Sequence, residues 1–361
     1  MRILLGGGGN TALLPYLHRP ASARRGLTTV AVVPGMCRRC YSSRHYWVEG
    51  NDDEGRKESV VVVMGATGTG KSKLSIELAT RFSGEVVNSD KIQVYRGLDV
   101  TTNKMPVVER CGVPHHLLGE VDPAAGEVSP AAFREMAARA IAGITGRGLL
   151  PVVAGGSNSM VHAAMAVSYD PERSPFAADW RWRRKRREGA LRYRCCFLWV
   201  DVEAAALAEQ LDRRVEEMVG AGMVEELDRY FAEEAKSDAG KLRHPGLAKA
   251  IGVAEFREYF RGEGRGTAAA YQAAMAAIKT NTRRLAEEQV RKIERLEELG
   301  WPLLRLDATA AVTARLAGSA AEEAEAAWER DVAGPSSAVV EQFLKEAVEG
   351  HHAVPSHLIY T

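Results

Sequence analysis

A short glycine-rich stretch carries the clearest chemical signal in this chain of 361 residues. Residues 65–72 read GATGTGKS and satisfy the pattern G-x-x-x-x-G-K-[ST] at every required position. Backbone N–H groups in such a loop point at anionic oxygens, Lys71 adds a point charge, and Ser72 offers an oxygen to Mg²⁺. The stretch therefore predicts a phosphate- or diphosphate-binding loop, called the phosphate loop below, made of Gly65, Ala66, Thr67, Gly68, Thr69, Gly70, Lys71 and Ser72.

The residues on both sides of the phosphate loop supply the structural context that it needs. The apolar run 60–64 reads as a strand, and 73–82 reads as a helix with Leu74, Leu78 and Phe82 on one face. A strand, a glycine-rich loop and a helix in this order are typical of α/β folds with a parallel sheet. We expect a P-loop NTPase-like parallel sheet flanked by helices, with a small helical C-terminal appendage.

A second short strand is expected to bring a carboxylate to the same place. Residues 85–88 read as a strand and lead into SDKIQVY at 89–95. Open α/β sheets bind ligands at the carboxyl ends of their strands. Asp90 is therefore expected to face the phosphate loop.

Three stretches together resemble the isopentenyltransferases that prenylate adenine N6: GATGTGKS at 65–72, NSDKIQVYRGLD at 88–99 and PHHLLG at 114–119. The resemblance covers about 60–306 and is greater with the plant-type adenylate enzymes that make cytokinins than with the relatives that act on tRNA. Those relatives usually have Ser where this chain has Lys91. The resemblance implies transfer of the dimethylallyl group from dimethylallyl diphosphate to N6 of the adenine of ATP, ADP or AMP, the first step of cytokinin biosynthesis.

On this resemblance the catalytic residues are Asp90, Thr67 and Lys71. Lys71, Thr67 and Mg²⁺ at Ser72 would stabilise the negative charge that develops on the departing diphosphate. Asp90 would accept a hydrogen bond from the weakly nucleophilic adenine amine, orient it and take its proton. Mg²⁺ is the expected cofactor.

Further segments are expected to contribute to binding. The turn AGGSNS at 154–159 would offer backbone donors to an anion or allow tight packing, and the resemblance places such a turn beside the donor diphosphate. Either Arg213 or Arg214, on a helix expected over 201–218, would hold the donor's terminal phosphate. In related enzymes the basic residue ahead of an Ile-Gly pair approaches the diphosphate. Lys249 occupies the corresponding position in this sequence. The binding residues expected outside the phosphate loop are Gln93, Gly155, Gly156, Ser157, Arg214 and Lys249.

The remaining periodic segments complete the expected fold. Helices are expected over 129–147 and 267–299. Strands are expected over 149–153, in the apolar run that begins at 195, and over 303–306. The Ala- and Glu-rich residues 311–361, with helical pieces near 313–330 and 336–348, are interpreted as the peripheral appendage to an isopentenyltransferase domain at 57–310.

Two groups of potential metal ligands are better explained without a metal: the histidines as structural or substrate-rim residues and the cysteines as structural residues. His115 and His116 are adjacent, so in a strand they point to opposite faces, and no third ligand lies at a fitting spacing. The cysteines form no paired framework, and Cys195 and Cys196 open an apolar run typical of a buried strand.

The acceptor is the point on which alternatives remain. The stretch WRWRRKRR at 180–187 would bind nucleic acid or form a solvated loop. The tRNA-modifying relatives carry a substantial helical insertion here, which 169–194 is too short to build, and the net charge of +1 gives no overall basic field. A free adenosine phosphate is therefore expected, with no tRNA and no membrane partner. The alternatives are a tRNA dimethylallyltransferase, a P-loop small-molecule kinase with Asp201 as a Mg²⁺ ligand, and a nucleotide-binding module without catalysis.

The first residues have the composition of a transit peptide. Residues 1–48 lack Asp and Glu and contain seven Arg separated by Ser, Thr, Gly and Pro. We interpret 1–56 as a transit peptide and linker. Plastid import is expected because most of the resembling plant enzymes are plastidic, and the Arg-rich character makes the mitochondrion the alternative.

A fluorescent protein fused behind residues 1–51 is expected to enter an organelle, and deletion of 1–51 is expected to leave activity intact while retaining the protein in the cytosol. Microscopy of both proteins checks this. A fusion that remains cytosolic would contradict the transit-peptide interpretation.

Overall fold

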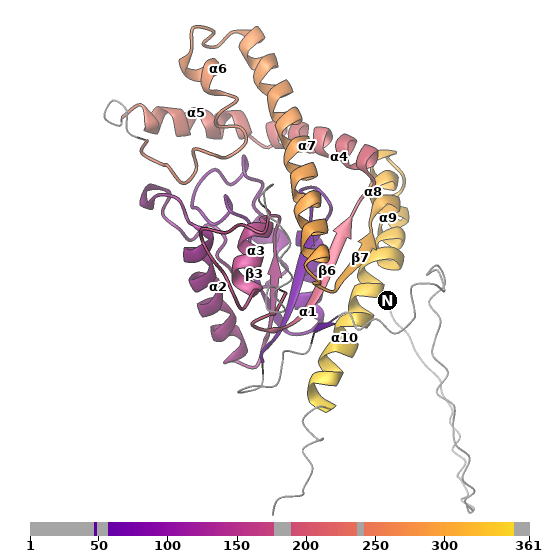
Figure 1. Cartoon of the computed structure of the whole chain (residues 1–361). Coiled ribbons are helices and arrows are strands. Elements are labelled where there is room, and N and C mark those ends of the chain that lie inside the picture. Colours follow the sequence, from indigo (N-terminus) through magenta and orange to yellow (C-terminus); the bar gives the residue numbers. More distant parts are fainter. Residues whose placement is uncertain (1–46, 49–56, 177–188, 237–241, 350–361) are drawn as a thin grey trace, which may run out of the picture. The chain divides into compact units, whose positions relative to one another are not determined.

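The computed structural model describes residues 47–48, 57–176, 189–236 and 242–349, within one compact unit that spans 45–361 (Figure 1). Two predictions lie outside the described residues: the transit segment apart from Trp47–Val48 and the Trp/Arg stretch 180–187. The described part contains no helix both long and apolar enough to cross a membrane.

A parallel sheet forms the centre of this unit, as the sequence predicted. Its strands are β1 (Trp47–Val48), β2 (Ser59–Gly65), β3 (Gly84–Asn88), β4 (His115–His116), β5 (Leu150–Ala154), β6 (Arg194–Asp201) and β7 (Leu303–Asp307). The parallel order is β4–β3–β5–β2–β6–β7, and β1 pairs antiparallel with the start of β6. The chain leaves the central strand β2 toward β3 on one side and later places β6 on its other side. The end of β2 is therefore a topological switch point, where open α/β sheets bind ligands.

Both faces of the sheet are buried, because the side chains of β2 alternate between two apolar clusters. Val60, Val62 and Met64 pack on one face, Val61 and Val63 pack on the other, and all are fully buried. Parallel strands buried on both sides need a helical layer on each face. This requirement explains the nearly continuous apolar run that precedes the phosphate loop.

Two helical layers cover the sheet. The first cluster contains side chains of α2 (Pro130–Thr145), α3 (Asn158–Met165) and the later part of α7 (Ala268–Glu298), and the second contains those of α1 (Lys71–Arg81), α8 (Thr309–Leu316), α9 (Ala321–Trp328), the π-helical turn η3 (Glu329–Ala333) and α10 (Gly334–Glu349). The helices α4 (Ala204–Gly220), α5 (Met223–Glu234) and α6 (Arg257–Arg261) lie beyond the carboxyl ends of the strands with the start of α7 (Figure 1). Short 3₁₀ turns, η1 (Val107–Glu109) and η2 (Pro123–Ala125), complete the order.

The local signals in the sequence explain where several helices begin. The Ser129 hydroxyl accepts a hydrogen bond from the Ala132 amide at 3.1 Å, and Pro130 occupies the first turn of α2. Gly222, with φ of 97°, separates α4 from α5. The long helix predicted over 267–299 is α7, capped by Thr267.

The C-terminal helices expected from the sequence are present, and they pack closely on the sheet. Trp328, Val332, Val340 and Phe343 are at most 2% exposed and belong to the same cluster as Leu198 of β6. Their wide spacing between Ala and Glu residues concealed this buried face. The segment 309–349 is therefore part of the layer that covers one face of the sheet.

Phe343→Ala should lower the free energy of unfolding by about 3–5 kcal/mol, because it empties a fully buried aromatic site between α10 and the sheet. Denaturant unfolding measures this, with the exposed neighbour Gln342→Ala expected to change stability by less than about 0.5 kcal/mol. Equal small effects of the two substitutions would mean that α10 is peripheral after all.

Candidate functional site

The phosphate loop joins β2 to α1, as predicted, and it is folded tightly on itself. Gly70 precedes the helix with φ of 96°, a left-handed conformation that glycine adopts without strain. The carbonyl oxygen of Ala66 accepts hydrogen bonds from the Lys71 ammonium at 2.6 Å and the Thr69 hydroxyl at 3.0 Å. The lysine is therefore held against its own loop at the N-terminus of α1, where an anion is favoured.

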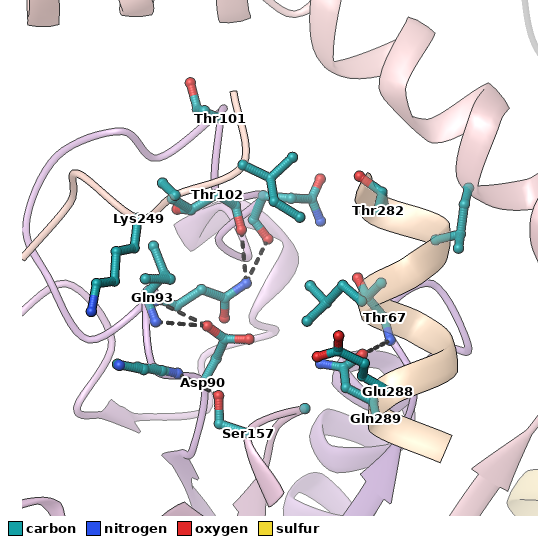
Figure 2. Close-up of a pocket in the computed structure, with 18 of the residues that line it drawn as sticks. Thr67, Asp90, Gln93, Thr101, Thr102, Ser157, Lys249, Thr282, Glu288 and Gln289 are labelled. Carbon is teal, nitrogen blue, oxygen red and sulfur yellow. Dashed lines mark hydrogen bonds between the residues drawn. The ribbon is translucent and has the colours of Figure 1, made fainter. Parts of the chain in front are cut away.

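A cavity of about 480 Å³ opens beside this loop, at the carboxyl edge of the sheet (Figure 2). We refer to it as the pocket. Seven of the predicted site residues line it: Thr67, Asp90, Gln93, Gly156, Ser157, Arg214 and Lys249. Residues 101–103, 250–251 and one side of α7, none of which the sequence singled out as site residues, complete much of the wall. The pocket thus unites segments from most of the chain.

Asp90 is fixed by the turn that it begins. Its Oδ1 accepts hydrogen bonds from the amides of Ile92 at 2.9 Å and Gln93 at 3.2 Å. The amide of Lys91 donates to the Ser157 hydroxyl at 2.8 Å. The second carboxylate oxygen of Asp90 points into the pocket (Figure 2), so this carboxylate is held ready for a ligand without further ordering.

The Gly155–Gly156 turn supports this arrangement through close packing. A methyl group on Gly155 would lie 2.5 Å from the backbone carbon of Ser89, and one on Gly156 would lie 2.2 Å from Nε2 of Gln289. The tight-packing alternative for this turn is therefore confirmed. Anion binding by the same turn stays a prediction.

Two cations lie near each other at the phosphate loop. Burial and the nearby Arg214 charge lower the pKa of Lys71 to about 7, and the Asp90 charge acts in the opposite direction. Burial also lowers the pKa of Arg214, again opposed by Asp90. Arg213, the other candidate, is exposed and donates to carbonyl oxygens at the end of α8. Of the two arginines, Arg214 is thus the one at the pocket.

Lys249 lines the pocket at its rim rather than near the loop. Its ammonium lies 2.6 Å from Oε1 of Glu127, and Lys91 approaches Oε2 of the same carboxylate at 3.4 Å. The hydrogen bond from Lys249 and the charge of Lys91 lower the pKa of Glu127. The side chain of Lys249 extends away from Asp90 (Figure 2). Contact between Lys249 and a diphosphate on the phosphate loop stays a prediction.

Gln93 has a defined amide orientation in the pocket. Its Nε2 donates to the carbonyl oxygens of Thr102 at 3.0 Å and Asn103 at 3.1 Å (Figure 2). Both bonds require the NH₂ group on that side, so the carbonyl oxygen of the side chain is left for a ligand.

Helix α7 contributes a stripe of pocket residues that sequence reasoning missed. Ile278, Thr282, Leu285 and Gln289 recur at helical spacing along the pocket wall. The Gln289 carbonyl accepts a hydrogen bond from the Thr67 amide at 2.8 Å and so ties α7 to the phosphate loop. Leu285 is 37% exposed and lines the pocket. The sequence signal for this wall of the pocket was the pair of polar residues, Thr282 and Gln289, that interrupt the apolar stripe.

One wall of the pocket is apolar. It consists of Leu211, Val215 and Met218 on α4 and Ile278 and Leu285 on α7. The opposite wall carries Asp90 and Gln93 with the polar residues 101–103. Such a lining suits a hydrocarbon group on one side, a hydrogen-bond donor on the other and a phosphate group near the phosphate loop.

The groups available to Mg²⁺ are those of a loop that shares the ion with a substrate. Ser72 is the second residue of α1 and is exposed, and no cluster of three or more His, Cys, Asp or Glu lies among the described residues. Mg²⁺ is commonly held by few protein oxygens together with phosphate oxygens and water, so a single hydroxyl fits. Asp201 is engaged elsewhere, because its Oδ2 accepts bonds from Arg305 at 2.9 and 2.5 Å.

The adjacent histidines have structural partners, in line with the structural alternative. Nε2 of His116 lies 2.6 Å from Oε2 of Glu85, which also binds Arg147. Nδ1 of His115 lies 2.8 Å from the carbonyl oxygen of Val113. The contact with Glu85 joins β4 to β3, whereas the contact with Val113 is local to the segment that leads into β4.

Sequence comparisons identify the relatives of this chain. The family model described as IPP transferase matches residues 93–178 and 161–295. An adenylate isopentenyltransferase of Humulus lupulus is 47% identical over 304 residues, which cover 79% of this chain and 90% of the relative. Adenylate isopentenyltransferase 8, chloroplastic, of Arabidopsis thaliana is 45% identical, covering 81% and 87%. Adenylate isopentenyltransferase 7, mitochondrial, of the same plant is 40% identical, covering 84% and 86%.

Solved structures share the fold. A eukaryotic dimethylallyltransferase acting on tRNA aligns with a TM-score of 0.64 and 24% identity, covering 80% of each chain. A tRNA isopentenylpyrophosphate transferase of Bacillus halodurans aligns with a TM-score of 0.60 and 25% identity, covering 82% of this chain and all of the other. The α/β architecture is thus shared with proteins named as tRNA-modifying transferases.

Binding of diphosphate should be accompanied by proton uptake at Lys71. In the free site its pKa is about 7, so near pH 8 the amine is largely neutral, and an adjacent anion raises the pKa again. Calorimetry with inorganic diphosphate and Mg²⁺ in two buffers of different ionisation enthalpy should show uptake of about one proton.

Lys71→Arg is the matched control for this experiment, because a guanidinium stays protonated throughout this pH range. The difference between the two proteins isolates Lys71 from protons that diphosphate itself exchanges. Equal proton uptake by wild type and Lys71→Arg would contradict the lowered pKa.

Proposed function

The chain belongs to the IPP transferase family, and from this premise we propose that it is an adenylate dimethylallyltransferase. It transfers the dimethylallyl group of dimethylallyl diphosphate to N6 of the adenine of ATP, ADP or AMP, which begins cytokinin biosynthesis. The observation that carries the proposal is a phosphate loop that faces a fixed carboxylate across an apolar-walled pocket. The relatives named adenylate isopentenyltransferases support the same reaction.

The donor's diphosphate binds the phosphate loop, and its hydrocarbon part lies along α4 and α7. Breaking the allylic C–O bond builds negative charge on the bridging oxygen while the allylic carbon becomes cation-like. Lys71 and Arg214, both at the loop, favour that charge, as do the backbone N–H groups. The low pKa of Lys71 in the free site gives this residue a strong preference for an anion beside it.

Asp90 serves the acceptor. The lone pair of the adenine amine is delocalised into the ring, so the amine needs both orientation and removal of a proton. Because Oδ1 of Asp90 is occupied by backbone amides, the other oxygen is available to accept the amine's hydrogen bond and then its proton as the C–N bond forms. The oriented amide of Gln93 offers a second acceptor on the same wall.

Mg²⁺ fits as the cofactor, held by the Ser72 hydroxyl together with substrate oxygens and water. When bound, it supplies further positive charge to the departing diphosphate. This chain's own contribution is the hydroxyl at the N-terminus of α1.

The alternatives have less support. A kinase would need Asp201 for the metal, and this side chain is engaged by Arg305. The solved neighbours that act on tRNA share the fold, whereas relatives of 40–47% identity are named adenylate isopentenyltransferases. The basic stretch 180–187 that would contact RNA lies outside the described residues.

The names of the relatives bear on the organelle to which the protein is imported. Several of them are named chloroplastic and one mitochondrial, which supports an organellar destination. We propose the plastid, with the mitochondrion as the alternative, on the composition of residues 1–48.

The direct test is incubation with labelled dimethylallyl diphosphate, Mg²⁺ and each of AMP, ADP, ATP and tRNA. Labelled N6-dimethylallyl nucleotide is expected with at least one adenosine phosphate. Product with tRNA alone would favour the tRNA dimethylallyltransferase alternative over this proposal. Absence of product with all four acceptors would overturn the proposal.

Asp90→Asn should slow single-turnover transfer by about 10²–10⁴ while changing donor affinity much less. Asparagine keeps an oxygen for the Ile92 and Gln93 amides, so the turn is retained while the proton acceptor is lost. Donor affinity and single-turnover rate are measured at two Mg²⁺ concentrations. Recovery of the rate at high Mg²⁺ would instead identify Asp90 as a metal ligand.

A further inference from the structure

The side of the phosphate loop that faces away from the pocket rests on a tryptophan from the C-terminal segment. A methyl group built on Gly70 would lie 2.7 Å from Cη2 and 2.8 Å from Cζ3 of Trp328. Trp328 is 2% exposed. The indole therefore occupies the space in which any other residue at this position would place its side chain.

Side chains of α1 fix the indole in this place. Nε1 of Trp328 donates to Oε2 of Glu77 at 2.9 Å, and the Lys73 ammonium lies 4.6 Å from the ring centroid. Lys73 also binds Glu325 at 2.8 Å and Glu77 at 3.0 Å. These contacts join α9 to the first turns of the helix that carries Lys71 and Ser72.

The backbone after Trp328 is irregular at the point where the segment turns onto the sheet. Residues Glu329–Ala333 form a π-helical turn that contains the fully buried Val332, and Phe343 beyond the turn is also fully buried. A π-helical turn accommodates one additional residue and frequently occurs at functional sites. Here it connects the helix that ends at Trp328 to α10, which packs on the sheet, so the position of the indole is coupled to the core.

We propose that Trp328 is a positioning residue for the phosphate loop. The ring supports the left-handed backbone at Gly70 from behind, so that the N–H groups at the start of α1 stay directed at the leaving diphosphate. Electrostatic stabilisation of this kind depends on donors that need no reorganisation during the reaction. Trp328 is not among the residues that line the pocket, and it lies beyond the residues matched to the family model, which end at 295. The inference rests on the proposed function, because it takes diphosphate as the ligand of the loop.

Trp328→Leu and Trp328→Phe test the inference, with Phe343→Leu as the matched control. Phe343 is equally buried in the same C-terminal segment but packs on the sheet and over Arg194. Three quantities are measured for each protein: the affinity for inorganic diphosphate with Mg²⁺, kcat and KM for each substrate, and the thermal midpoint.

Trp328→Leu should weaken diphosphate binding and lower kcat/KM for dimethylallyl diphosphate roughly ten- to a hundredfold, since small displacements of positioned groups have effects of this size. The KM of the adenosine phosphate should stay within about twofold. Trp328→Phe retains a ring behind Gly70 and loses the bond to Glu77, so it should fall between Trp328→Leu and wild type. Phe343→Leu should lower the thermal midpoint while leaving donor binding unchanged.

Unchanged diphosphate affinity and donor kinetics in folded Trp328→Phe and Trp328→Leu would overturn the inference and make Trp328 an ordinary core residue. If Trp328→Leu does not fold, wild-type diphosphate affinity in Trp328→Phe overturns it equally. Failure of the wild-type protein to bind diphosphate at all is a different result, because it removes the proposed function rather than the role of Trp328.

Discussion

Two basic side chains at the phosphate loop, Lys71 and Arg214, are the constraint on which the rest of this structure depends. Burial lowers the pKa of Lys71 and that of Arg214, and the charge of Arg214 lowers the pKa of Lys71 further. Asp90 is the carboxylate that acts against both shifts. Such an arrangement is unfavourable without an anion, and a bound diphosphate relieves it. The site is thus organised around a ligand with more negative charge than the protein supplies.

The fold holds this loop from several directions with residues that are far apart in sequence. The Gln289 side chain of α7 accepts a hydrogen bond from the Thr67 amide. A methyl group on Gly68 would lie 2.7 Å from the Leu211 side chain of α4, and Trp328 packs against Gly70. These supports come from helices on both sides of the sheet. A loop that must bind a leaving group without moving needs such support, which explains why the C-terminal helices belong to the core.

The same cradle serves alkyl transfer rather than phosphoryl transfer because of what lies opposite it. Across the pocket stand a carboxylate with one free oxygen and an apolar wall, an arrangement suited to an amine and a hydrocarbon. The acid at the end of β6, Asp201, is engaged by Arg305. The chemistry therefore follows from the second strand and the helices, whereas the loop alone specifies only phosphate.

The sequence was sufficient for the parts of the site that depend on local patterns. The phosphate loop, the strand before it and the turn at Asp90 each have a signature within a few residues, and all lie where they were predicted. Gln289 and Trp328 could not be found in this way. Their roles depend on contacts with Thr67 and Gly70, which lie at least 222 positions earlier in the chain. Lys249 illustrates a further limit, since Glu127 determines where its charge lies.

The central claim, that the loop holds a leaving group, is tested most directly by dimethylallyl diphosphate labelled with ¹⁸O at the oxygen between C1 and the α-phosphorus. Alkyl transfer breaks the C–O bond and forms the C–N bond to adenine, so mass spectrometry should find the label in the released diphosphate. The account predicts this result together with an unlabelled N6-dimethylallyl nucleotide. Label retained in dimethylallyl alcohol or its monophosphate, with a phosphoryl group on the acceptor, would show cleavage of a P–O bond and contradict the account.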